Sequence, residues 1–82
     1  MEDLYAFLKQ LGNNLYENGE YLLAYALDGW QKTGHSSTTE AMGDLEAILK
    51  QYESGKNIVI NQQVKECLQF IDEWFRKWNG RK

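Results

Sequence analysis

The sequence predicts a small all-α protein, a four-helix bundle in which two longer outer helices flank a short central helical hairpin. Three observations favour this fold class. Apolar residues recur at spacings of three and four along separate segments, the pattern of a helix with one buried face. One of these segments begins with a helix-capping motif. The chain has 82 residues, enough for one modest core, so we expect a single helical domain over residues 1–82.

The first helix is expected to end before Asn18-Gly19, a dipeptide typical of helix stops and turns. Glu2 and Asp3 lie in its first turn, where the positive end of the backbone dipole favours carboxylates. Its apolar stripe consists of Leu4, Leu8, Leu11 and Leu15.

A second helix is expected from Glu20 to about Lys32. The run from Tyr21 to Leu27 leaves this helix almost no polar face, and a helix that is apolar all round belongs at the centre of a bundle. We expect Gly34 to supply the left-handed residue that closes it.

The third helix is predicted to start at Ser37-Thr38-Thr39-Glu40, which fits the capping box. We expect it to end near Gly55, which follows Ser54. Its apolar face consists of Ala41, Met42, Leu45, Ile48, Leu49 and Tyr52.

The last helix has the strongest pattern in the chain, with a plausible N-cap at Asn61. Its stripe consists of Val64, Leu68, Ile71, Phe75 and Trp78. The preceding β-branched run, residues 58–60, is interpreted as an extended connector, although the helix could instead begin at Asn57. Gly80 is expected to end the helix. The bases that complement its negative end are Arg76, Lys77, Arg81 and Lys82.

Residues that carry catalysis are sparse. His35 is the only histidine and lies in a loop, so any histidine-based catalytic pair would rest on a flexible turn, and we expect a solvated loop side chain. Cys67 is the only cysteine and is expected to be a small buried hydrophobe. One cysteine and one histidine cannot build a closed zinc site, and no glycine-rich phosphate loop is present. We therefore expect a protein without enzymatic activity, metal or cofactor.

Charge is distributed unevenly along the chain. Residues 1–48 hold eight acidic and two basic side chains, a net charge of −6, whereas residues 49–82 hold four acidic and seven basic ones, a net charge of +3. Such asymmetry predicts an acidic surface that steers a basic partner. The acidic residues predicted to form it are Glu17, Glu20, Asp28, Glu40, Asp44 and Glu46.

Three Trp, five Tyr and three Phe are more large side chains than four short helices can bury, so some must lie near the surface. Tyr and Trp dominate binding hot spots, which favours a contact surface. Trp30, at the end of the second helix, joins the predicted partner-binding residues. The other aromatics expected near the surface are Tyr5, Phe7, Tyr16 and Phe70.

These features together favour a non-enzymatic, acidic protein-interaction protein, such as an inhibitor, an immunity protein or an antitoxin-like regulator that covers a basic surface on its target. The alternative is a homodimeric structural or accessory subunit. Binding of nucleic acid or a membrane surface through the aromatic and basic residues 74–82 is a weaker third hypothesis. Glu40, Asp44 and Glu46 in the third helix would repel phosphate and argue against a helix-turn-helix.

The sequence also bears on localisation. The longest apolar run, residues 21–27, is too short to span a membrane. The N-terminus begins Met1-Glu2-Asp3 rather than with the basic residues of a secretory signal, so a cytoplasmic protein is expected.

Overall fold

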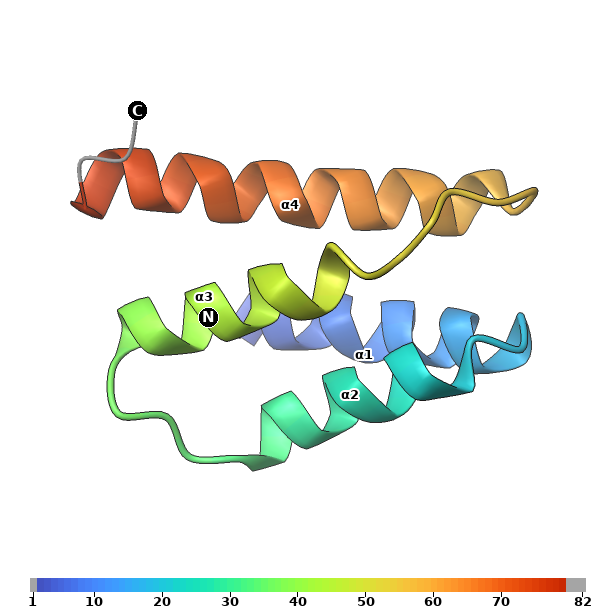
Figure 1. Ribbon diagram of the computed structural model, residues 1–82, viewed down its shortest axis with the longest axis horizontal. Helices are drawn as coiled ribbons and strands as arrows, with labels where there is room; N and C mark the ends of the chain where they lie inside the picture. Colours follow the sequence, from blue (N-terminus) through green and yellow to red (C-terminus); the bar gives the residue numbers. More distant parts are fainter. Residues whose placement is uncertain (1, 80–82) are drawn as a thin grey trace.

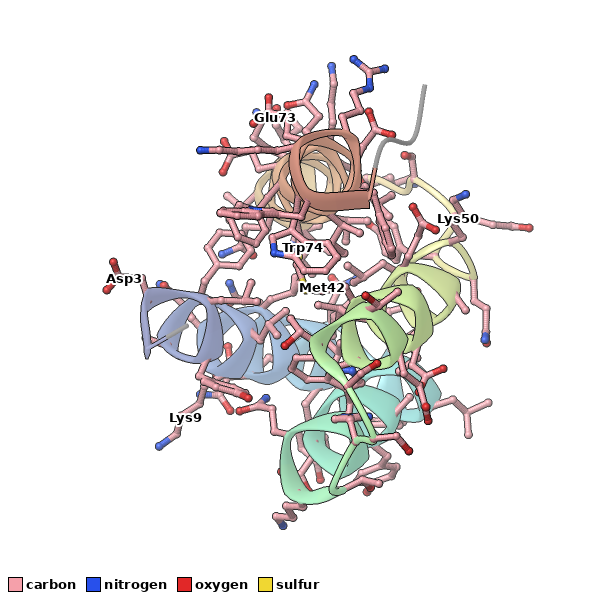
Figure 2. All side chains as sticks on the ribbon, turned by 90° about the vertical axis from the view of Figure 1, so that its left-hand side faces the viewer. Asp3, Lys9, Met42, Lys50, Glu73 and Trp74 are labelled. Carbon is pink, nitrogen blue, oxygen red and sulfur yellow. The ribbon has the colours of Figure 1, made fainter. Side chains whose placement is uncertain are left out.

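The computed structural model describes residues 2–79 as an all-α four-helix bundle (Figure 1). The helices are α1 (Glu2–Glu17), α2 (Tyr21–Lys32), α3 (Thr38–Leu49) and α4 (Ile58–Asn79). Each helix packs against the next along the chain, and α4 closes the bundle against α1. In Figures 1 and 2, α4 and α2 lie on opposite sides, with α1 and α3 between them. The predicted fold class, a small all-α four-helix bundle, is confirmed, and α1 and α4 are the two longer helices. The predicted arrangement of two outer helices around a central hairpin is wrong, because the four helices pack in a ring and none of them is central.

All four helices contribute to one hydrophobic core. Figure 2 shows Met42 of α3 and Trp74 of α4 pointing into the interior between the helices. The fully buried large side chains are Leu8, Leu11, Leu15, Leu27, Met42, Leu45, Leu49, Ile60 and Ile71. The predicted apolar stripes of α1 and α3 therefore face the core, with Ile48 and Tyr52 partly buried at its edge.

Helix α1 ends where the sequence predicts. Gly19 has a φ of 86°, in the left-handed region that glycine adopts without strain. The Glu20 amide then donates to the Leu15 carbonyl at 2.8 Å, which satisfies one of the last carbonyls of the helix.

Helix α2 is not at the centre of the bundle, so that prediction is wrong. Leu23 and Leu27 face the core, but Tyr21, Leu22 and Tyr25 are exposed. The physical reason is that α2 packs only against α1 and α3, which leaves its other side to solvent.

The predicted closing glycine of α2 is also wrong. Among the described glycines only Gly19 has a positive φ, so Gly34 takes no left-handed conformation. The helix ends at Lys32, because its C-cap Thr33 is extended, and the Thr33 hydroxyl donates to the Gly29 carbonyl at 2.7 Å.

The capping prediction for α3 is confirmed at its serine, because Ser37 Oγ accepts a hydrogen bond from the Glu40 amide at 3.1 Å. The helix nevertheless ends at Leu49, well before Gly55. The segment beyond it is tied to α4 instead. The Tyr52 hydroxyl donates to Asn61 Oδ1 at 2.5 Å, and Asn61 also bonds the backbone N–H and carbonyl of Gly55.

Helix α4 begins at Ile58, so the extended-connector interpretation of residues 58–60 and the N-cap at Asn61 are both wrong. The alternative start is confirmed, since Asn57 Oδ1 accepts a hydrogen bond from the Ile60 amide at 3.1 Å. Arg76 and Lys77 lie in the last turn of α4, as predicted. Gly80, Arg81 and Lys82 lie outside the described residues.

The stripe of α4 is buried at Val64, Ile71 and Phe75 and half-buried at Leu68. Trp78 continues the same stripe but is 65% exposed. Trp78 is exposed because α4 is long. Its 22 residues extend past the N-terminal end of the 12-residue α3, so α3 does not cover the last turn of α4 (Figure 1).

Candidate functional site

His35 is packed into the structure rather than solvated, so the expectation of a solvated loop side chain is wrong. Its Nε2–H donates to the Trp30 carbonyl at 3.1 Å, and its ring centroid lies 5.3 Å from that of Trp30. Its Nδ1 lies 3.7 Å from a carboxylate oxygen of Asp44. These contacts give His35 a structural role in joining the α2–α3 loop to both helices.

Cys67 is buried, as predicted, with 2% of its surface exposed. Burial raises the pKa of its thiol from 9.0 to about 11, so the reactive thiolate is scarce at neutral pH. Among residues 2–79, no group of three or more His, Cys, Asp or Glu side chains is placed to hold a metal ion.

Trp30 does not lie near the surface, and that expectation is wrong. It is 5% exposed, and its indole N–H donates to the Ala41 carbonyl at 2.8 Å. Tyr5 packs beside it, with the ring centroids 5.8 Å apart. Trp30 therefore joins the end of α2 to α3 and is not available as a contact residue.

The six acidic residues predicted to bind a partner do not form one surface. Glu17 and Glu20 flank the turn between α1 and α2, at the opposite end of the bundle from the start of α3, where Glu40 lies (Figure 1). Asp44 lies midway along α3. Asp28 lies on the exposed side of α2. Its carboxylate is 2.9 Å from the ammonium of Lys32, one turn further along.

Glu46 differs from the other five because it is half-buried. It lines an open groove of about 610 Å³ between α3 and α4. Lys50, Lys65 and Asp72 also line this groove, which therefore carries both signs of charge and favours no charged partner.

Three tyrosines on α1 and α2 form an exposed cluster of aromatic rings. The ring centroid of Tyr16 lies 5.0 Å from that of Tyr21 and 6.2 Å from that of Tyr25, and both ring pairs meet edge to face. Their exposed fractions are 50%, 52% and 61% in that order. We call these three residues the tyrosine face.

Sequence reasoning found Tyr16 but missed Tyr21 and Tyr25, because the apolar run was assigned wholly to the core. A second pattern in α2 could have revealed them. Tyr21, Tyr25, Asp28 and Lys32 recur at spacings of four, three and four, and all four are exposed. An aromatic stripe that continues into a charged pair indicates a solvent-facing side.

The other aromatics predicted near the surface have mixed outcomes. Tyr5 and Phe70 are exposed in part, as predicted, whereas Phe7 packs against the core. Phe7 and Phe70 line a cleft of about 350 Å³ between α1 and α4, whose floor includes Leu4 and Cys67.

The predicted basic segment at the end of α4 is partly engaged within the helix. Arg76 Nε lies 3.0 Å from a carboxylate oxygen of Asp72. The Lys77 ammonium lies 5.5 Å from the ring centroid of the exposed Trp78. No helix within residues 2–79 is long and apolar enough to cross a membrane.

No family model matches this chain, and no curated protein or solved structure matches it either. The fold and surface define it only as a small four-helix bundle that exposes a tyrosine face beside acidic side chains.

Proposed function

We propose that this protein is a non-enzymatic binding protein that covers a basic surface on a protein partner, in the manner of an inhibitor, an immunity protein or an antitoxin-like regulator. The observation that carries the proposal is the tyrosine face. Glu17 and Glu20 adjoin it at the α1–α2 turn, and Asp28 follows one helical turn after Tyr25.

The chemistry of this face supports recognition of a protein. Tyrosine is enriched among the residues that dominate binding energy, because a rigid ring buries a large area at small entropic cost. Its neighbouring carboxylates would raise the rate of encounter with a basic surface. Glu40 and Asp44, on α3, would add long-range attraction rather than contacts.

The experiment compares the wild-type protein with the double variant Tyr21→Ala and Tyr25→Ala in capturing proteins from a cell extract. Both side chains are more than half exposed, so the variant is expected to fold. For a basic protein retained by the wild type, we expect the variant to bind at least about tenfold more weakly, a loss of about 1.4 kcal/mol. The matched control is Ile58→Ala, which removes an exposed apolar side chain from α4.

A charge variant tests the acidic neighbours separately. Replacing Glu17, Glu20 and Asp28 by their amides should slow association and flatten its salt dependence, because charges at the rim act mainly on the on-rate. Binding that is insensitive to both variants would contradict the proposal. So would tight binding of DNA or RNA at physiological salt that depends on Arg76 and Lys77.

Self-association is a second candidate function, and one observation favours it. Leu22 and Ile58 are 86% and 79% exposed, and a second copy packed over them would remove their apolar surface from water. In a homodimer, sedimentation equilibrium at micromolar concentration would give twice the chain mass of 9.6 kDa. Leu22→Ser would then restore the monomer, whereas a monomer at all concentrations would exclude this candidate.

A further inference from the structure

A hollow of about 200 Å³ lies in the seam between α1 and α2, next to the tyrosine face. Its lining residues are Gly12, Asn13, Tyr16, Ala24, Tyr25 and Asp28. Two of them, Gly12 and Ala24, are too small to fill the seam. A methyl group placed on Gly12 would meet no other side chain within 4 Å, so the space is open on the α1 side.

Two walls of the hollow are aromatic. Tyr16 and Tyr25 stand at 66° to each other, with ring centroids 6.2 Å apart, and each is at least half exposed. A cation within about 6 Å of a ring centroid is attracted by the negative face of the ring. Because the two rings meet edge to face, a cationic group in the hollow would stack on the face of one ring and touch the other at its edge.

The charge of the lining also favours a cation. Asp28 is the one lining residue with a charged side chain at neutral pH, and the side-chain amide of Asn13 offers an acceptor oxygen. The pair between Asp28 and Lys32 is exposed, so it contributes little stability and can be shared with a ligand. Lys9, the nearest base on α1 in sequence, points away from the bundle (Figure 2).

We propose that this hollow, the Gly12 pocket, binds an arginine side chain presented by the basic partner. The guanidinium lies against Tyr16 and Tyr25 and donates hydrogen bonds to Asp28. Arginine fits better than lysine because its planar, weakly hydrated head stacks on aromatic rings and donates in a fork. An apolar side chain from a second copy would take the exposed Asp28–Lys32 pair out of water without offering the carboxylate a further hydrogen bond, which is costly. This inference rests on the proposed function and names the group that the partner inserts.

The test uses three nine-residue peptides in which glycine alternates with arginine, with lysine or with citrulline, the neutral isostere of arginine. Binding is followed by the backbone amide shifts of the 15N-labelled protein. We expect the arginine peptide to shift Gly12, Tyr16, Tyr25 and Asp28, the lysine peptide to bind about threefold more weakly, and the citrulline peptide not to bind.

A pair of glycine variants separates binding from folding. Gly12→Leu fills the pocket, and leucine has a higher helix propensity than glycine, so the fold is expected to persist. Gly43→Leu is the matched control, because Gly43 is also half-buried inside a helix with open space around it, but lies on α3. We expect Gly12→Leu to weaken binding of the arginine peptide at least about tenfold and Gly43→Leu to leave it unchanged.

Three results would overturn the pocket. These are unchanged binding by Gly12→Leu, equal binding of the citrulline peptide, and shifts confined to Glu40 and Asp44. In each case the proposed function would be judged separately, by whether the Tyr21 and Tyr25 double variant loses the basic protein that the wild type retains. A partner lost by that variant but kept by Gly12→Leu would leave the function standing without the arginine pocket.

Discussion

Helices α2 and α4 place their apolar residues differently. Helix α4 is amphipathic along most of its length, with charged side chains facing solvent and Val64 and Ile71 facing the core. Helix α2 also buries one side, at Leu23 and Leu27, but its opposite side is aromatic rather than charged at Tyr21 and Tyr25.

This difference shows that the additional apolar residues of α2 lie on the surface of the protein and not in its core. A helix at the corner of a four-helix bundle can bury only the side that faces its neighbours. Seven consecutive apolar residues therefore exceed what a corner helix can bury, and the remainder becomes an exposed face. In a chain this small, such a run indicates an interface as readily as an interior.

The largest expected effects fall on the buried sides, where the two helices should behave alike. Leu27 and Ile71 are both fully buried, so Leu27→Ala and Ile71→Ala should each lower the free energy of unfolding by about 2–5 kcal/mol in urea titrations. Tyr25→Ala should cost less than about 1 kcal/mol, because its ring is mainly exposed. A cost below about 0.5 kcal/mol for Ile71→Ala would mean that α4 is not anchored by its stripe.

Substituting the two tryptophans near the ends of these helices should change the stability of the protein by very different amounts. Trp30→Phe removes the buried hydrogen bond from the indole N–H to the Ala41 carbonyl and replaces a buried side chain by a smaller one, which should cost about 1–3 kcal/mol. Trp78→Phe should change the free energy of unfolding by less than about 0.5 kcal/mol, because Trp78 is exposed. Thermal and urea unfolding measure both variants, and an equal loss of stability for Trp30→Phe and Trp78→Phe would contradict this contrast.

Most of the fold follows from the sequence because one-sided apolar stripes specify helices. The stripe of α1, the stop at Gly19 and the cap at Ser37 are local features, set by residues within one or two turns. The start of α4 is predicted wrongly because the β-branched residues 58–60 favour an extended connector, whereas in the structure the Asn57 cap starts the helix before them and Asn61 contacts Tyr52 instead of capping it.

The candidate site followed from the sequence only in part. An aromatic surplus predicts an exposed contact surface, but not which aromatics form it. The sequence does not show that Trp30 is buried, because its partner, the Ala41 carbonyl, comes from the next helix. The sequence places the acidic residues in one half of the chain, whereas the fold sets the α1–α2 turn, with Glu17 and Glu20, at the opposite end of the bundle from the start of α3, where Glu40 lies (Figure 1).

The first residues of α2 and α4 should also differ in how much their substitution lowers the stability of the protein. Asn57 caps α4 through its side chain, so Asn57→Ala should lower the free energy of unfolding by about 0.5–2 kcal/mol. Glu20 precedes α2 and makes no side-chain capping bond, so Glu20→Ala should change it by less than about 0.5 kcal/mol. Circular dichroism during urea unfolding measures both free energies. A larger loss for Glu20→Ala than for Asn57→Ala would contradict the assignment of Asn57, and not Glu20, as a side-chain cap.

The smallest effects on stability concern the matched ion pairs, Lys32 with Asp28 in α2 and Arg76 with Asp72 in α4. Each joins residues four apart and is exposed, so Lys32→Gln and Arg76→Gln should each cost less than about 0.5 kcal/mol, and less still at high salt. Their effects on binding should differ. Lys32→Gln releases the Asp28 carboxylate to the Gly12 pocket and should strengthen binding of the arginine peptide about twofold, the equivalent of about 0.4 kcal/mol.

Arg76→Gln changes the net charge by the same amount but lies on α4, away from the residues that line the pocket, so it isolates the local effect. If both variants strengthened binding equally, the peptide would be responding to the net charge of the protein. If only Lys32→Gln did so, the gain would come from Asp28 within the pocket. Each variant removes one positive charge from an ion pair between residues four apart, so the two differ only in where that pair lies.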